Sequence, residues 1–346
     1  MHAPEVSPQN YDDDISPIIN DLMKRYPVFI AIVALASLCL SAVSAVEPEK
    51  ESLNVLFIGN SYTARHHLSE VVKSMAEAGK PGLEFEISTV LYGGRRLVDH
   101  WRLGTQNFVG ISTLTREQEQ ATIASLEKAI ADNPKDSHAK RALGLHRKLL
   151  GELESQRKKW DVVVLQSYRD DLEGDASLYA EYAPKFAEIV RAQGGRVLPY
   201  ETSPTTQNAE ALTSAPDPAP TLEKSRSIAA LAERLNAAVA PMSLVALRCQ
   251  TKRPDFTLRF INDGHLNHTM AYLTACTIYA ALFEKSPEGL PINSITDNRF
   301  LDKDRANSDK DADGKPIKRT FSKKDVSDLQ KMAWDAYQEF QQMRRE

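Results

Sequence analysis

The feature that most constrains this chain is an alternation of short apolar segments with longer helical ones. Helical periodicity covers residues 64–79, 178–193, 222–239 and 268–283, and a last helix begins near Lys323. Between the helices, apolar segments have the length and composition of buried strands. Strands that alternate with helices pair in parallel, and the helices cover both faces of the sheet. The sequence therefore predicts an α/β fold around a parallel sheet of about five strands. The segments expected to form these strands are 53–58, 83–90, 161–165, 196–200 and 242–247.

Residues 115–159 interrupt this alternation. Ile123, Leu126 and Ile130 are spaced as one face of a helix, and Asn133-Pro134 then breaks the pattern before a second helix begins. This pattern predicts a charged helical hairpin inserted between the second and third strands. A role for the hairpin as a lid or substrate wall is an open alternative to a purely structural one.

Residues 1–45 have the features of a secretory signal. A basic start at Lys24-Arg25 precedes an apolar run over 28–40 and small residues that end at Ala45. The run is shorter than the roughly 20 residues of a membrane-spanning helix. We therefore expect cleavage after Ala45 and a periplasmic or extracellular mature chain, with an uncleaved anchor as the alternative. Because a signal starting at Met23 would be complete, residues 1–22 are interpreted as a spurious extension.

Composition narrows the class of protein. The 346 residues are 26% charged and carry a formal net charge of −4, which excludes a disordered chain and gives no basic excess for nucleic acid. We expect no nucleic-acid partner and no membrane span in the mature chain. After signal removal Cys249 and Cys276 remain. Export would permit a disulfide between them, although the apolar surroundings of Cys276 favour a small core residue.

The stretch Gly59-Asn60-Ser61-Tyr62-Thr63 follows the first predicted strand. A strand that delivers a serine into a turn at the start of a helix places its hydroxyl at the carboxyl edge of the sheet, where open α/β folds bind ligands. Ser61 is therefore a candidate nucleophile, and the alternative is a plain helix cap. The stretch lacks the second glycine of a Gly-x-Ser-x-Gly elbow, which disfavours a general α/β-hydrolase.

Three later stretches carry residues suited to the same chemistry. Gly93, in a Gly-Gly pair after the second strand, could aim a backbone amide at a ligand, and Gln166 at the end of the third strand could donate to an oxyanion. His265 stands two residues after Asp263 and just before an apolar helix, so it could act as a base that Asp263 orients. Simple turns are the alternative for the glycine pair and the histidine.

Taken in order, these stretches resemble the blocks of the SGNH/GDSL hydrolase superfamily. The resemblance covers about residues 52–340 and is nearest to an exported bacterial subgroup, with further matches at Leu97, His100, Trp101, Tyr272 and Leu273. It implies a three-layer α/β/α, flavodoxin-like fold and ester hydrolysis through an acyl-enzyme on Ser61, with His265 as base. The oxyanion would be held by the amides of Ser61 and Gly93 and by the side chain of Gln166. Export and the resemblance together suggest acetyl-type esters on carbohydrate, and the substrate class would be a small-molecule or polysaccharide ester.

Two departures from the superfamily pattern bear on activity. Gln166 stands where an Asn is usual, and Asn262 occupies the position three before His265, where the orienting acid is usual. We favour Asp263 as the acid in place of Asn262, and His268 is a weaker rival base. These departures keep open a second hypothesis, a catalytically weak or inactive protein of the same fold that binds glycan or a protein partner.

No cofactor or metal site is predicted. The stretch from Asp309 to Gly314 resembles the start of a calcium loop, but Thr320 stands at the twelfth position, where a bidentate Glu is needed. A solvated surface loop is the favoured interpretation. The histidines show none of the spacings of a zinc site.

Overall fold

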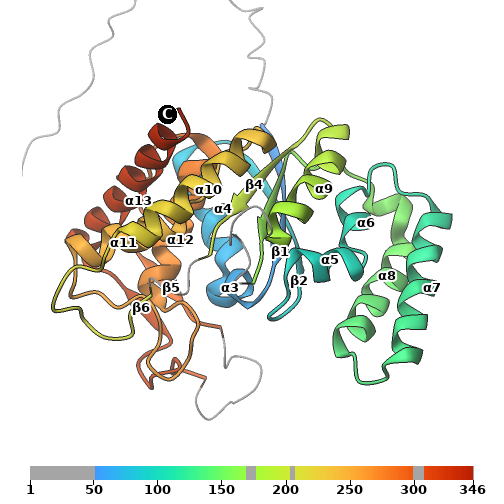
Figure 1. Ribbon diagram of the computed structural model, residues 1–346, viewed down its shortest axis with the longest axis horizontal. Coiled ribbons are helices and arrows are strands. Elements are labelled where there is room, and N and C mark those ends of the chain that lie inside the picture. Colours follow the sequence, from blue (N-terminus) through green and yellow to red (C-terminus); the bar gives the residue numbers. More distant parts are fainter. Residues whose placement is uncertain (1–50, 169–176, 203–206, 299–307, 346) are drawn as a thin grey trace, which may run out of the picture. The chain divides into compact units, whose positions relative to one another are not determined.

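A parallel sheet of four strands runs through the described part of the chain (Figure 1). The computed structural model describes residues 51–168, 177–202, 207–298 and 308–345, and the predicted signal segment lies outside these residues. The strand order is β2-β1-β3-β4, so the chain crosses from β2 over β1 to β3. The strands are β1 (Ser52–Gly59), β2 (Glu84–Leu91), β3 (Val162–Gln166) and β4 (Arg196–Tyr200).

Helices cover both faces of this sheet, which confirms the predicted three-layer α/β/α architecture. On one face α4 (Leu68–Gly79) packs against β2 and α12 (His268–Phe283). On the other face α9 (Leu178–Ala192) packs against β3, β4 and α5 (Leu97–Arg102). Strands covered on both faces are apolar along their whole length, and all five residues of β3 are buried.

The remaining elements surround this core. A two-stranded antiparallel sheet, β5 (Ser294–Thr296) with β6 (Lys318–Thr320), follows α12 in the chain. The C-terminal helix α13 (Lys323–Met343) packs against α12 and α11 (Met242–Lys252). The other elements are α3 (Ser61–Ala64), η1 (Arg65–His67), α6 (Thr105–Val109), α7 (Arg116–Asp132), α8 (Ser137–Gln156) and α10 (Ala219–Leu235).

The fifth strand predicted over residues 242–247 is wrong, because this segment begins helix α11. Its leading residues are buried on every side, so they lack the polar face that distinguishes an amphipathic helix from a strand. Among the residues that the structure describes, only an isolated parallel bridge between Tyr200 and Ala240 continues the sheet beyond β4. Pro241 follows that bridge and caps the helix.

The single helix predicted over residues 64–79 is interrupted. The backbone is left-handed at His66 (φ 62°) and His67 (φ 49°), which separates α3 and η1 from α4. A non-glycine residue rarely adopts such angles, and they cluster at functional sites. The break turns the buried His66 ring toward the C-terminal part of the chain, where its Nε2 donates to the carbonyl of Leu266 at 2.7 Å.

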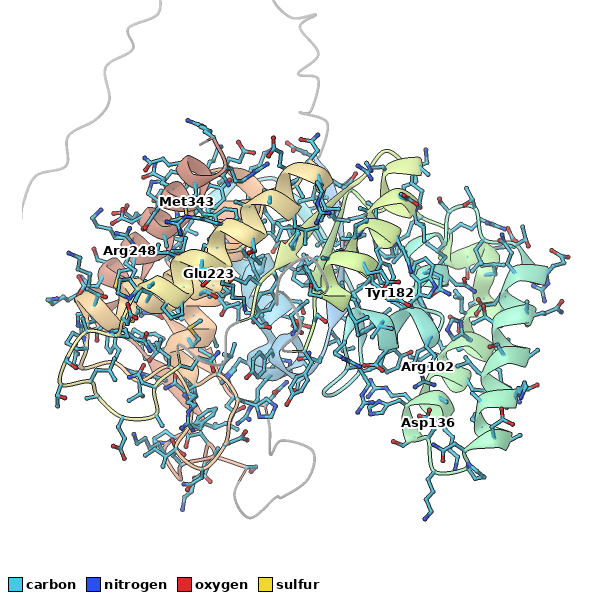
Figure 2. The ribbon with its side chains drawn as sticks, in the orientation of Figure 1. Arg102, Asp136, Tyr182, Glu223, Arg248 and Met343 are labelled. Atoms are coloured by element: carbon cyan, nitrogen blue, oxygen red, sulfur yellow. The ribbon has the colours of Figure 1, made fainter. Side chains whose placement is uncertain are left out.

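Helices α7 and α8 form the inserted hairpin between α6 and β3 (Figure 1). A buried pair, His146 with Glu119 at 2.7 Å, joins the two helices, and His146 also donates to the carbonyl of Leu103. Figure 2 shows Arg102 of α5 and Asp136 at the start of α8 lying close together, and their side chains form an ion pair of 3.1 Å. The hairpin is therefore tied to the sheet domain by specific polar contacts.

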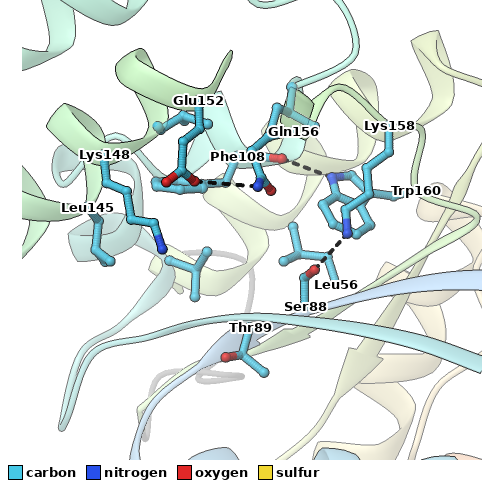
Figure 3. Close-up of a pocket in the computed structure, with 13 residues that line it drawn as sticks. Leu56, Ser88, Thr89, Phe108, Leu145, Lys148, Glu152, Gln156, Lys158 and Trp160 are labelled. Carbon is cyan, nitrogen blue, oxygen red and sulfur yellow. Dashed lines mark hydrogen bonds between the residues drawn. The ribbon is translucent and has the colours of Figure 1, made fainter. Parts of the chain in front are cut away.

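A cavity of about 200 Å³ lies between α8 and the strands β1 and β2 (Figure 3). Lys158 donates to the Ser88 hydroxyl at 3.0 Å at its edge, and Trp160 donates to the carbonyl of Phe108 at 2.9 Å. Its lining contains neither Ser61 nor His265. The cavity is thus separate from the predicted catalytic residues.

Cys249 and Cys276 are both free thiols in buried positions. Burial raises the pKa of the Cys249 thiol to about 12, which keeps it protonated at neutral pH. Among the described residues, no helix combines the length and the apolar character needed to cross a bilayer.

Candidate active site

Ser61 is placed at the carboxyl edge of the sheet by the turn that follows β1. Asn60 is fully buried and caps the first turn of α3, where its Oδ1 accepts from the amide of Tyr62 at 3.0 Å. The turn is tight at Gly59, because an added Cβ would lie 2.6 Å from side-chain oxygens of Gln166 and Thr63. The packing of this turn therefore fixes where the Ser61 hydroxyl points.

His265 comes from the other end of the chain and meets Ser61 at this edge. The Ser61 hydroxyl donates to His265 Nε2 at 2.8 Å, and the other ring nitrogen donates to Asp263. The same Asp263 oxygen accepts from the backbone amide of His265 at 3.1 Å. The hydroxyl of Tyr62, whose ring lies edge-on to the imidazole, donates to the carbonyl of Gly264 at 3.1 Å. The arrangement is a serine, a base and an orienting acid in hydrogen-bonding sequence.

A buried arginine, Arg65, also binds the carboxylate of Asp263. Arg65 donates to Asp263 at 2.8 Å and forms a paired contact with the fully buried Asp297, at 2.8 and 2.7 Å. Burial alone would raise the pKa of Asp263, but hydrogen bonds from His265 and Arg65 outweigh it and lower that pKa to about 2. Asp263 is therefore ionised at neutral pH and accepts hydrogen bonds from both neighbours.

The loop that carries His265 is fastened by a second acid, Asp313. Its carboxylate accepts from the backbone amides of Ile261 and Asn262, each at 3.0 Å, and Asp311 in turn accepts from the amide of Asp313 at 2.9 Å. The segment that resembles the start of a calcium loop thus holds the backbone of the loop that carries His265. The contacts of Asn262 face Asp313, so the structure places Asp263 against the imidazole.

Gly93 lies level with Ser61 at the same sheet edge. Gly59 pairs with Leu91 across β1 and β2, so Ser61 and Gly93 each stand two residues beyond a paired position. Gly93 is exposed, and within the described ranges neither its amide nor that of Ser61 has a hydrogen-bond acceptor. Two unpaired amides at one edge are suited to hold a developing oxyanion.

Gln166 is turned away from this edge, which corrects the expectation of a third donor. Its Oε1 accepts from the amide of Asn60 at 2.8 Å and from the Thr63 hydroxyl at 3.1 Å, while its Nε2 donates to the carbonyl of Ser167. The side chain is fully buried. Because Gln is one methylene longer than Asn, its amide reaches the turn beneath Ser61 and supports the backbone there.

His100 supports the same turn from the next helix. Its Nε2 lies 2.9 Å from the carbonyl of Gly59, and its Nδ1 lies 3.0 Å from the Thr105 hydroxyl. A carbonyl only accepts, so the proton is on Nε2, and Nδ1 accepts from Thr105. Complete burial lowers the pKa of His100 to about 4 and keeps the ring neutral.

This low pKa predicts a loss of stability in mild acid. The unfolded chain takes up a proton on His100 near pH 6.5 and the folded chain only near pH 4, so protons favour unfolding between these values. Compared with His100→Gln, the native protein should lose about 3 kcal/mol more unfolding free energy between pH 7 and pH 4. Urea titrations at the two pH values measure this difference, and equal losses in both proteins would contradict it.

The described residues contain no group of three or more His, Cys, Asp or Glu side chains arranged to hold a metal ion. The rival base His268 is buried and lies 2.7 Å from the carbonyl of Ile317 through its Nε2, away from Ser61. Sequence reasoning missed Arg65, Asp297 and Asp313. The local signals were Arg65 itself, four residues after the candidate nucleophile, and the acidic stretch from Asp309 to Gly314, which contains Asp313.

Comparison with known proteins finds similarity to solved structures alone. No protein-family model matches this chain, and a search of curated proteins finds no match. Among solved structures, the chain is similar to a DUF4886 family protein from Bacteroides uniformis, with 16% identity, a TM-score of 0.45 and coverage of 83% of this chain and 95% of that one.

Two further solved structures are similar. One is a candidate SGNH hydrolase from Slackia heliotrinireducens, with 17% identity, a TM-score of 0.41 and coverage of 67% of this chain and all of that one. The other is a gut microbial diltiazem-metabolizing enzyme, with 15% identity, a TM-score of 0.33 and coverage of 69% of this chain and 48% of that one. The strand order, the layers and the edge site are those of a flavodoxin-like α/β fold with a serine, a histidine and an acid at the carboxyl ends of its strands.

Proposed function

We propose that this protein is an exported serine esterase that hydrolyses carboxylic esters through an acyl-enzyme on Ser61. The observation that carries the proposal is the 2.8 Å contact between the Ser61 hydroxyl and His265 Nε2, with Asp263 bound to the other ring nitrogen. An ionised acid holds the imidazole in the tautomer that can accept a proton from serine. The arrangement fits nucleophilic catalysis better than a structural cap.

The proposed reaction has two halves. His265 takes the Ser61 proton while the oxygen attacks the ester carbonyl, and the amides of Ser61 and Gly93 stabilise the negative oxygen. His265 then gives the proton to the departing alcohol, which leaves the acyl group on Ser61. A water molecule, activated by His265 in the same way, releases the carboxylic acid and restores the serine. Asp263 stabilises the imidazolium that forms in each half.

The proposed substrates are acetyl-type esters on carbohydrate, and the proposed location is periplasmic or extracellular. Both rest on the signal-like segment before Ala45 and on the resemblance of the motifs. The alternative is a weakly active or inactive binding protein, and the inward hydrogen bonds of Gln166 favour it, since they leave the oxyanion to two backbone amides. Removal of one good oxyanion donor typically costs about 10²–10³ in rate.

Labelling with a fluorophosphonate separates the two functions. We expect the purified mature protein to be labelled on Ser61 and to hydrolyse p-nitrophenyl acetate, and Ser61→Ala to do neither. Ser74→Ala, which removes an exposed serine from α4, is the matched control and should behave as the native protein does. A native protein that is neither labelled nor active under conditions where it is folded would support the binding protein.

A further inference from the structure

A group of basic side chains lies beside Gly93, and the catalytic scheme above does not use it. Arg95 and Arg96 come from the loop between β2 and α5, and His138 and Arg141 come from the first turns of α8. Together they are called the Arg95–Arg141 cluster. Two of its members lie beside Tyr92, whose ring centroid is 6.0 Å from the Arg141 guanidinium carbon and 6.3 Å from the His138 ring.

Nearby acids neutralise the positive charge of the cluster only in part. Among the described residues, no carboxylate lies within salt-bridge distance of Arg95 or Arg141, and Arg96 has Asp99 only at 3.8 Å. By contrast, the neighbouring Arg102 is paired with Asp136 at 3.1 Å. Partial burial lowers the pKa of His138, and the charges of Arg95 and Arg141 lower it further, whereas the charges of Asp136 and Asp99 raise it. Both guanidinium groups therefore act on the same imidazole.

The cluster borders the site where the ester would react. Asn60, the residue before Ser61, donates from its Nδ2 to the carbonyl of Arg95 at 3.2 Å. Arg95 Nε in turn lies 3.4 Å from the carbonyl of Gly93. A group bound between Arg95 and Arg141 would therefore be attached close to the acyl group on Ser61.

A second feature of the cluster also points to a ligand. Tyr92 is fully buried, and its hydroxyl has no hydrogen-bond partner in the described part of the chain. Buried polar groups are nearly always paired, and the rare exceptions mark unfilled polar sites or strain. Here the unpaired hydroxyl belongs to a residue whose ring lies beside Arg141 and His138.

We propose that the Arg95–Arg141 cluster is an anion subsite, so that the ester substrate carries an acidic group, a carboxylate or a sulfate, on the sugar next to its acyl group. The preference for an ester rests on the proposed function, whereas the binding of an anion does not. Guanidinium groups bind planar carboxylates through two parallel hydrogen bonds, so a uronic acid is the favoured source of the anion. The proposed substrate class thereby narrows to acylated acidic glycans.

Binding to the Ser61→Ala protein tests the subsite without catalysis. By calorimetry at low salt, oligogalacturonate should bind at least 10-fold more tightly than neutral xylo-oligosaccharide. Arg95→Gln and Arg141→Gln should each reduce this preference by about 10-fold, because each removes a charge-assisted pair. Arg147→Gln, which removes an exposed charge from the same helix α8, should not. Tighter binding of a sulfated oligosaccharide would support the subsite and assign sulfate as its anion.

Hydrolysis by the native enzyme separates the two proposals. Acetylated polygalacturonate should be preferred over acetylated xylan in kcat/KM, and the preference should be lost in Arg141→Gln while turnover of neutral p-nitrophenyl acetate is kept. Anion binding without any ester hydrolysis would keep the subsite and reject the esterase. Equal binding of acidic and neutral oligosaccharides, unchanged in Arg95→Gln and Arg141→Gln, would overturn the subsite whatever the activity.

Discussion

Replacement of His265 by alanine is expected to lower kcat for ester hydrolysis by about 10³–10⁶-fold with little change in KM, because residues of a catalytic triad act as a unit. Ser61 keeps its hydroxyl in this variant but loses the only base within hydrogen-bonding distance among the described residues. Steady-state kinetics with p-nitrophenyl acetate measure the loss. Reaction of Ser61 with a fluorophosphonate should fall in parallel, since both depend on removal of the same proton.

The control is His67→Asn, which removes a neighbouring exposed histidine at a left-handed position that Asn tolerates. It should keep the native rate within a few-fold. Asp263→Asn should lie between the two, because it leaves the ring in place but removes the charge that holds its tautomer. A His265→Ala protein with native kcat would mean that another group is the base and would overturn the assignment.

Replacement of Arg65 by methionine should be strongly destabilising, by about 3–5 kcal/mol, because it leaves a buried charge without its partner. Asp297 is fully buried, and Arg65 is its paired contact at 2.7 and 2.8 Å. The variant also frees Asp263, so the position of His265 and the rate should suffer together. Urea denaturation gives the free energy of unfolding, and circular dichroism shows whether the fold persists.

Two comparisons make this prediction specific. Arg102→Met breaks an ion pair whose arginine is 44% exposed, and such surface pairs contribute at most about 1 kcal/mol. In the double variant Arg65→Met, Asp297→Asn the orphaned charge is gone, so part of the lost stability should return. If Arg65→Met and Arg102→Met were equally mild, the buried pair would contribute no more than a surface one.

The parts of this molecule that sequence could predict are those encoded by local pattern. The apolar runs of β1 to β4 and the helices between them follow from periodicity. Strand-end motifs located Ser61 and Gly93, and the start of an apolar helix located His265. The exception is α11, where buried residues on every side erased the period that separates helix from strand. Local pattern also gave no indication of the left-handed backbone at His66 and His67.

The contacts that hold the site in place could not be predicted from the sequence, because they join residues that are far apart in the chain. Arg65 meets Asp297 across 232 residues, and Asp313 meets Ile261 across 52. Nothing in the sequence indicates either pairing. For Gln166, the position in the fold was predicted but the hydrogen-bond partners were not. The motif placed it correctly at the end of β3, but only the geometry reveals that its amide serves the turn beneath Ser61.

The contact between Ser61 and His265 spans 204 positions of the chain, and Tyr62 reaches Gly264 across 202. The reactive centre is therefore completed only when the last quarter of the polypeptide packs against its beginning. A nascent or truncated chain that has formed β1 through β4 would hold a serine with no proton acceptor. If Ser61 is the nucleophile of an esterase, as proposed above, such a chain would be inactive until the segment that carries His265 has been made and has packed against the turn after β1.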